Sequence, residues 1–177
     1  MENEKIEVFS IPLKHRIYTN GFLFKEKNDN RKLNIEEIKK IPDIKIIDYK
    51  NLKLGKDFQT IEGQIIPNKK LTFDPPKRLS YAFCSDTSFY LPIVEYVKHV
   101  DLLYHESTFL KTEEKRAINT GHSTAYQAAY IAKKAKVKKL LLGHYSNRFP
   151  NIKSFENEAK EIFFNVEASE PLKKYYL

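Results

Sequence analysis

The chain has 177 residues, 41% of them hydrophobic and 31% charged, which is typical of one globular domain. No apolar run is long enough to span a bilayer, and the polar N-terminus has no apolar segment behind it that would indicate a secretory signal. A formal net charge of +8 permits a polyanionic partner such as RNA without establishing one. The single cysteine, Cys84, excludes an internal disulfide, and its apolar surroundings favour a buried thiol in a cytoplasmic protein.

The first part of the chain predicts two strands separated by a short polar segment. Residues 5–13 alternate between apolar and polar side chains and then become apolar, which is typical of a strand. Residues 17–25 carry Tyr18, Phe22 and Phe24 and predict a second strand. His15 lies at the boundary between them. Taken alone, His15 is best interpreted as a half-exposed loop residue.

A charged insertion interrupts the strand pattern at residues 26–58. It contains a short predicted helix at 35–41, which Asn34 would cap, and then a mixed apolar and basic segment. The insertion is either a basic arm that binds a substrate or a solvated excursion from the sheet. Residues 59–78 predict a small hairpin that turns at Gly63.

Three apolar runs in the second part of the chain each end in chemically capable side chains. Residues 80–84 lead to Asp86, residues 100–104 lead to His105 and Glu106, and residues 139–143 lead to His144. Helical patterns at 89–99, 124–136 and 154–163 follow, with Thr124 and Ser154 as predicted caps, and residues 173–177 suggest an edge strand. Runs of this kind that alternate with helices predict β-α-β units of a buried sheet. Ligands bind at the carboxyl ends of such strands, so these polar residues predict a site there, with His122 on a nearby loop.

The order of these blocks resembles the C-terminal motifs of ribonuclease Z. The blocks are Ser85-Asp86-Thr87, His105-Glu106-Ser107-Thr108-Phe109, Gly121-His122-Ser123-Thr124 with Gln127-Ala128-Ala129, and His144-Tyr145-Ser146-Asn147-Arg148-Phe149. The resemblance implies an α/β fold, the metallo-β-lactamase αββα sandwich, of which residues 1–177 would be the C-terminal half. It also implies a zinc-dependent endoribonuclease that removes the 3′ trailer from precursor tRNA.

The resemblance implies a part in the site for seven residues. Asp86 would bridge two Zn²⁺ ions, with His15 as a ligand of one ion and His144 as a ligand of the other. His122 would donate a proton to the leaving 3′ oxygen, and Glu106 would orient His122 and favour its protonated form. Arg148 and Ser146 would support the site or contact phosphate. His105 would be a structural, hydrogen-bonded histidine rather than a ligand, and His99 a residue on the surface of a helix.

The sequence departs from the resemblance in two ways. The upstream motif His-x-His-x-Asp-His, which supplies most zinc ligands, is absent, so we expect the chain to be one half of an enzyme and inactive by itself. A separate N-terminal half is then an expected partner. The stretch Ile41-Pro42-Asp43 also lacks a Gly-Pro pair that is familiar in the arm of relatives, and the arm, residues 26–58, would bind the tRNA.

Two alternatives remain open at the level of sequence. The first is another phosphodiesterase with the metallo-β-lactamase fold, acting on small substrates. The second is a non-catalytic half-domain that binds RNA or a partner chain without metal. The resemblance further implies a homodimer where the fold is complete, and it implies no association with a membrane.

Overall fold

The computed structural model describes residues 3–27 and 29–176. The chain divides into two compact units. The larger unit consists of Met1–Glu26 together with Leu79–Leu177, and the smaller unit is Lys27–Arg78. Among the described residues, no helix is long and apolar enough to cross a membrane.

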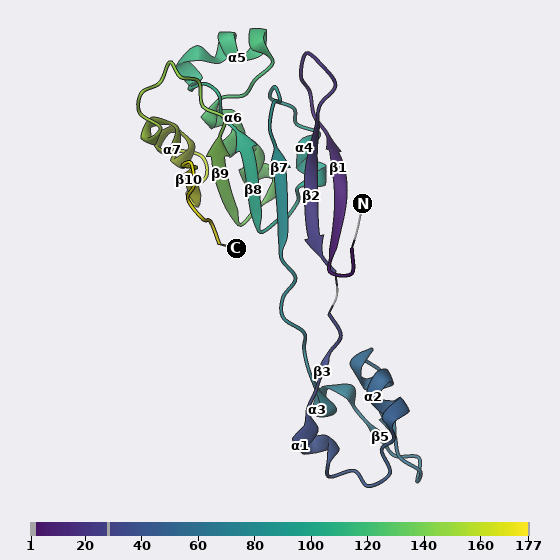
Figure 1. Ribbon diagram of the computed structural model, residues 1–177. Helices are drawn as coiled ribbons and strands as arrows, with labels where there is room; N and C mark the ends of the chain where they lie inside the picture. Colours follow the sequence, from purple (N-terminus) through teal and green to yellow (C-terminus); the bar gives the residue numbers. More distant parts are fainter. Residues whose placement is uncertain (1–2, 28, 177) are drawn as a thin grey trace. The chain divides into compact units, whose positions relative to one another are not determined.

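A six-stranded sheet with the strand order β1-β2-β7-β8-β9-β10 forms the larger unit (Figure 1). The strands β1, β2 and β7 are antiparallel, whereas β7, β8, β9 and β10 are parallel. Their bounds are β1 Ile6–Pro12, β2 Asn20–Glu26, β7 Ser80–Cys84, β8 Leu102–Glu106, β9 Lys139–Gly143 and β10 Val166–Ala168. The parallel strands therefore bring their carboxyl ends to one edge of the sheet, where the predicted site residues follow.

One face of this sheet packs against helices and forms the main core. The register places Leu23, Ala82 and Leu103 side by side on that face, and all three are buried. The helices of this unit are α4 Ile93–Tyr96, α5 Glu114–Thr120, α6 Ala125–Ala135 and α7 Lys153–Lys160, with a 3₁₀ turn at Lys111–Glu113. Helix α6 presents small buried alanines, which allow a close approach to β8 and β9.

The opposite face of the sheet is aromatic and only partly covered. The register aligns Phe22 with Phe83 and Tyr104, and it aligns Phe24 with Tyr81. The Phe83 and Tyr104 rings stack with their centroids 4.7 Å apart, and Phe22 is 43% exposed. A row of large rings that remains partly exposed to water is typical of a surface that another layer covers.

The smaller unit has a core of its own. Its elements are β3 Lys32–Leu33, α1 Ile35–Ile38, α2 Ile46–Lys53, β4 Phe58–Gln59, β5 Ile65–Ile66, α3 Asn68–Leu71 and β6 Thr72–Phe73. The buried side chains of Ile38, Leu52, Phe58 and Leu71 form the core. The buried Asn68 side chain connects α3 to the end of α2 and the residues after it, because its Nδ2 donates to the carbonyl oxygens of Leu52 and Lys56 at 2.8 and 2.7 Å.

Several predicted elements are confirmed and others differ. The capping box is confirmed, because Thr124 accepts from the Gln127 N–H and Gln127 accepts from the Thr124 N–H. Ser154 as the cap of the last helix was wrong: α7 begins at Lys153 after Ile152, so Ser154 lies within its first turn. The predicted helix at 89–99 is only the single turn α4, since Pro92 restricts the preceding residue to non-helical backbone.

The C-terminal strand was also misplaced. Residues 173–176 form no strand, and Leu177 lies outside the described residues. The edge strand is instead β10, three residues long, which pairs in parallel with β9. Its shortness explains why alternation alone did not reveal it.

Candidate active site

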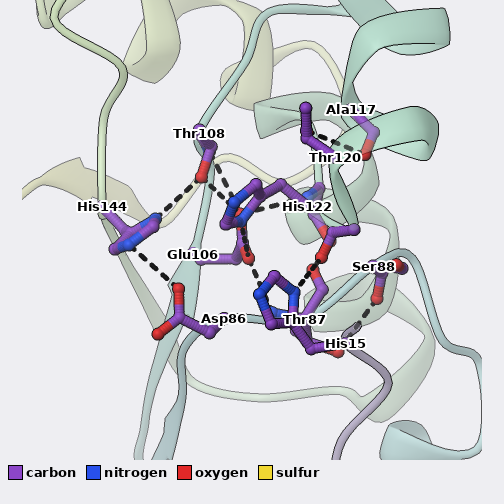
Figure 2. A network of polar contacts seen from close by, with 12 residues as sticks. His15, Asp86, Thr87, Ser88, Glu106, Thr108, Ala117, Thr120, His122 and His144 are labelled. Carbon is purple, nitrogen blue, oxygen red and sulfur yellow. Dashed lines mark hydrogen bonds and ion pairs between the residues drawn. The ribbon is translucent and has the colours of Figure 1, made fainter. Parts of the chain in front are cut away.

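Asp86, Glu106 and His144 meet at the carboxyl edge of the parallel strands, as the sequence predicts. Asp86 follows β7 by two residues, Glu106 is the last residue of β8, and His144 comes directly after β9. His122 joins them from the turn between α5 and α6. Figure 2 shows the four side chains pointing toward one another.

Asp86 and His144 face each other directly. The His144 Nε2 lies 3.0 Å from the Asp86 Oδ1, and both side chains are partly open to solvent. Both residues have left-handed backbones, with φ of +57° at Asp86 and +59° at His144. Non-glycine residues in this region carry strain of the order of 1 kcal/mol or more, and such residues concentrate at functional sites.

Thr108 determines which nitrogen of His144 carries the proton. The Thr108 hydroxyl donates its only hydrogen to the Glu106 Oε2, 2.6 Å away. The His144 Nδ1, 2.8 Å from the same hydroxyl oxygen, must therefore donate to it. In neutral His144 the Nε2 then carries a lone pair that faces the Asp86 carboxylate. Two acceptors at this distance require a shared cation, either a proton or a metal ion.

Glu106 is fully buried and accepts from groups on several sides. Its Oε1 accepts from the Thr87 N–H at 2.6 Å and from the His122 Nδ1 at 2.9 Å. Its Oε2 accepts from the Thr108 hydroxyl and from the Ser123 N–H at 3.0 Å. Burial by itself raises the pKa of Glu106, but the hydrogen bonds from His122, Thr108 and Ser123 outweigh it and hold the pKa below its usual value.

The Glu106 carboxylate changes the pKa of its partner His122. The hydrogen bond to Glu106 raises the pKa of His122, and the negative charges of Glu106 and Asp86 act in the same direction. Partial burial and the nearby Arg16 oppose this effect. The net effect is a higher pKa, so His122 is held closer to its protonated form and can act as a proton donor near neutral pH.

His15 lies on the other side of His122. The two ring centroids are 5.0 Å apart, and the His15 Nδ1 donates to the Gly121 carbonyl oxygen at 2.8 Å. This bond leaves the His15 Nε2 with a free lone pair. Gly121 has a φ of +82°, and a Cβ there would lie 2.8 Å from the His15 Nδ1, so glycine makes room for this ring.

The donor set at this edge fits a metal ion. Asp86, Glu106, His122 and His144 each offer one ligand atom, and these atoms lie within 4.8 Å of one another. Glu106 is the member that we set aside, because protein donors already occupy its oxygens. The remaining carboxylate and imidazole nitrogens are the ligands that zinc prefers. His15 is not in this group but lies beside it.

The other predicted residues have different surroundings. Ser146 is half-buried, and its N–H donates to the Thr108 carbonyl oxygen at 3.1 Å. Arg148 is exposed, and within the described chain its guanidinium makes no hydrogen bond or ion pair, so it is available to a phosphate.

Neither of the two remaining histidines belongs to the cluster. His105 is fully buried, and its Nδ1 donates to the Glu106 carbonyl oxygen at 2.8 Å. Burial lowers the pKa of His105, which keeps its ring neutral. His99 is exposed in a turn with a φ of +58° rather than in a helix.

Thr108 is a member of the candidate site that sequence reasoning missed. It lies within the block His105-Glu106-Ser107-Thr108, but no role was assigned to it. Its hydroxyl connects Glu106 to His144, which come from different strands. Its place in a polar block after a predicted strand was the available signal in the sequence, and only the tertiary structure shows its two partners.

Sequence comparisons find ribonuclease Z enzymes, whereas no family model matches the chain. The ribonuclease Z of Parabacteroides distasonis is 45% identical over 163 residues, and that of Porphyromonas gingivalis is 44% identical over 164 residues. Each alignment covers 92% of this chain and 53% of the relative. The chain thus spans about half the length of the curated relatives it matches, and the resemblance predicted from the motifs is confirmed.

Solved structures confirm the fold. A metallo-β-lactamase fold protein from Bacillus subtilis matches with a TM-score of 0.61 at 15% identity, over 96% of this chain and 49% of that protein. The short form of human tRNase Z matches with a TM-score of 0.53 at 20% identity, over 96% of this chain and 42% of the human chain. The chain therefore has the fold of about half of a metallo-β-lactamase-type protein.

Proposed function

We propose that this chain is the C-terminal half of a zinc-dependent endoribonuclease that removes the 3′ trailer from precursor tRNA. The observation that carries the proposal is the convergence of Asp86, Glu106, His122 and His144 at one sheet edge, in a chain similar to ribonuclease Z over 92% of its length. The setting we propose is the cytoplasm, which suits a chain with one buried thiol.

Three residues of the chain are proposed as zinc ligands. Asp86 would bridge two ions, His144 would bind one through its Nε2, and His15 would bind the other through the nitrogen left free by its bond to Gly121. Bound zinc would supply positive charge that offsets the charge that builds on the scissile phosphate. Three ligands do not complete a two-metal site, so the remaining ligands would come from elsewhere.

His122 and Glu106 are proposed to handle the proton of the leaving group. Glu106 raises the pKa of His122 and fixes its ring through a bond of 2.9 Å to Nδ1. The outer nitrogen of the protonated ring can then donate to the 3′ oxygen as it leaves. Arg148 and Ser146 would assist at the rim, where the exposed Arg148 guanidinium can meet a phosphate.

The partly exposed aromatic face supports a partner for the sheet. Phe22, Phe24, Tyr81, Phe83 and Tyr104 lie on that face, opposite the helices. We propose that the second sheet of the sandwich covers it, whether as a separate N-terminal half or as a preceding segment of the same protein. The complete enzyme is proposed to form a homodimer, and the isolated chain is proposed to be inactive.

The inserted region is proposed to bind the tRNA. Residues 26–58 lie almost entirely in the compact unit Lys27–Arg78, in which Lys and Arg outnumber Asp and Glu. A compact basic unit suits contacts to a phosphate backbone, which carry most of the affinity for nucleic acids and are sensitive to salt. Deletion of residues 28–56 should abolish cleavage of tRNA but spare hydrolysis of a small phosphodiester.

The decisive experiment reconstitutes the two halves. The chain is mixed with the complementary segment of the Parabacteroides distasonis enzyme, and cleavage of a precursor tRNA with a 3′ trailer is followed on a gel. We expect cleavage at the 3′ end only when both parts and zinc are present. An assembled, zinc-loaded complex that leaves the tRNA intact would count against the proposal.

The two alternatives give different results in the same experiment. Hydrolysis of bis-p-nitrophenyl phosphate without any cleavage of tRNA would favour another phosphodiesterase of this fold. RNA binding by the chain that survives exhaustive chelation, without cleavage in the mixture, would favour a non-catalytic binding module. Cleavage by the isolated chain would refute the requirement for a second half.

A further inference from the structure

Arg16 lies on the loop between β1 and β2, directly after His15. Two hydrogen bonds hold the loop where it enters this segment. The Lys14 N–H donates to the Thr87 hydroxyl at 3.2 Å, and the Lys14 carbonyl oxygen accepts from the Ser88 N–H at 2.7 Å. The backbone that leads into His15 and Arg16 is therefore fixed against the residues that follow β7.

The stem of the Arg16 side chain lies against the turn that carries His122. Its Cγ is 3.5 Å from the position that a Cβ at Gly121 would occupy, and Gly121 directly precedes His122. The same glycine accepts the hydrogen bond from the His15 Nδ1, at 2.8 Å. Arg16 is thus at the rim of the site, on the side where His122 lies.

The guanidinium of Arg16 has no partner in the chain. The residue is exposed, and within residues 3–27 and 29–176 its guanidinium forms neither a hydrogen bond nor an ion pair. The hydrogen bond to Glu106 raises the pKa of His122, and the charge of Arg16 acts against this increase. An unpaired cation in this place favours an anionic partner from outside the chain, and the planar guanidinium suits a phosphate.

The proposed role of His122 determines which phosphate of an RNA strand would meet this cation. His122 would donate to the 3′ oxygen that leaves, and the nucleotide that carries this oxygen has its own phosphate on its 5′ side. The scissile phosphate itself would face the proposed zinc ligands Asp86 and His144. A guanidinium whose stem lies beside His122 is therefore placed for the 5′ phosphate rather than for the scissile one.

We propose that Arg16 binds the 5′ phosphate of the nucleotide whose 3′ oxygen leaves. The contact would fix the register of the strand without reading a base, because phosphate contacts position a nucleic acid and carry no sequence information. Arg16 would touch the substrate one phosphate away from the bond that breaks. This inference rests on the proposed function.

A methylphosphonate at this one phosphate tests the inference, because it removes the negative charge that Arg16 would meet. Binding of the modified precursor tRNA to the reconstituted enzyme is measured in a chelator, so that the RNA is not cleaved. We expect the wild type to bind ~10–100-fold more weakly than it binds unmodified RNA. Arg16→Gln should weaken binding of unmodified RNA by a similar factor, and the methylphosphonate should cost it nothing further.

Arg116→Gln is the matched control. It removes the same charge from another exposed arginine of the larger unit, which pairs with Glu113 at 3.5 Å. This variant should keep the full penalty of the methylphosphonate. The inference is overturned if Arg16→Gln also keeps the full penalty, or if both variants lose it.

Cleavage in the presence of zinc separates the two phosphates. Arg16→Gln should lower kcat/KM for precursor tRNA by ~10–100-fold but should affect bis-p-nitrophenyl phosphate, which has a single phosphate, far less. Equal losses would place Arg16 at the scissile phosphate and overturn the inference. A wild type that shows the penalty in binding but does not cleave would uphold the contact and count against the proposed function. A wild type that cleaves and shows no penalty would overturn the contact alone.

Discussion

The Nε2 of His144 and the Oδ1 of Asp86 lie 3.0 Å apart, and neither carries a proton when His144 is neutral and donates from Nδ1 to Thr108. His144 comes directly after β9, Asp86 comes two residues after β7, and each has a left-handed φ. The chain therefore holds two acceptors against each other through strained backbone. An arrangement of this kind is stable when a cation lies between them or is shared by them.

Replacement of Asp86 by Asn tests the need for the charge. Asn has the same shape and tolerates a left-handed backbone, so we expect the fold to be retained. Zinc affinity of the reconstituted enzyme should fall by more than the ~10–100-fold that follows the loss of a supporting residue around a metal. Chelator competition measures this change. The control Asp43→Asn removes one exposed charge from the smaller unit, and an equal effect in the two variants would contradict the prediction.

Replacement of Thr108 by Val tests the link between Glu106 and His144. Valine has nearly the same volume but lacks the hydroxyl, so the His144 Nδ1 and the Glu106 Oε2 both lose a partner. We expect zinc affinity and the rate of trailer removal to fall by ~10–100-fold each. Thr108→Ser restores the hydroxyl and should recover most of both. Equal losses in the Val and Ser variants would mean that the methyl group, and not the hydroxyl, is what matters.

Replacement of Glu106 by Gln should destabilise the chain and lower the pKa of His122. The amide NH₂ would face N–H and O–H donors that now point at a carboxylate, so at least one buried donor would lose its acceptor. Each such loss costs roughly 1–3 kcal/mol. Urea unfolding measures the stability, and an NMR titration measures the pKa, which should fall because the bond from His122 to the carboxylate raises it.

A matched carboxylate on the surface provides the control for this variant. Glu113 forms an exposed pair with Arg116 at 3.5 Å, and pairs of this kind contribute about 0–1 kcal/mol. Glu113→Gln should therefore leave both the urea midpoint and the His122 titration close to wild type. A Glu106→Gln variant that behaves like Glu113→Gln would show that the buried network is not important for stability.

The lowered pKa of Glu156 predicts how the free energy of unfolding depends on pH. Burial raises the pKa of Glu156, but hydrogen bonds from Lys153, Lys160 and the Ala168 N–H outweigh it and lower the pKa from 4.5 to about 2. A carboxyl whose pKa is lower in the folded state stabilises the fold above the unfolded pKa. That contribution is lost as pH falls from about 4.5 to about 2.

Glu156→Gln should remove this part of the pH dependence. Because the two lysines are largely exposed, we expect a contribution on the order of 2 kcal/mol near pH 7 rather than the full value of the shift. Thermal unfolding of wild type and variant at pH 3 and pH 7 measures it. The two proteins should differ in stability at pH 7 and converge at low pH, and a constant difference would contradict the assignment.

The local patterns of the sequence were sufficient for much of the sheet and for the position of the site. Short apolar runs that lead to Asp86, Glu106 and His144 predicted three parallel strands and the gathering of these side chains at their carboxyl ends. This was possible because apolar runs and the residues that follow them are properties of neighbouring positions in the sequence. The capping box at Thr124 is local in the same sense. The prediction that Ser154 caps the last helix was wrong because it used local sequence alone. Serine is a favourable capping residue, but α7 begins one residue earlier, at Lys153.

Only the tertiary structure decided which groups become hydrogen-bond and packing partners. The Thr108 hydroxyl forms hydrogen bonds with both Glu106 and His144. The Gly121 carbonyl oxygen accepts from His15, which lies more than a hundred residues earlier in the chain. The Tyr104 ring occupies the space that a side chain at Gly143 would fill. None of these pairings follows from spacing, because each depends on which strands become neighbours. By itself, the sequence determined that carboxylates and imidazoles would gather at one edge of a sheet. The three-dimensional packing decided their tautomers and charges, because hydrogen-bond partners and burial act through space rather than along the chain.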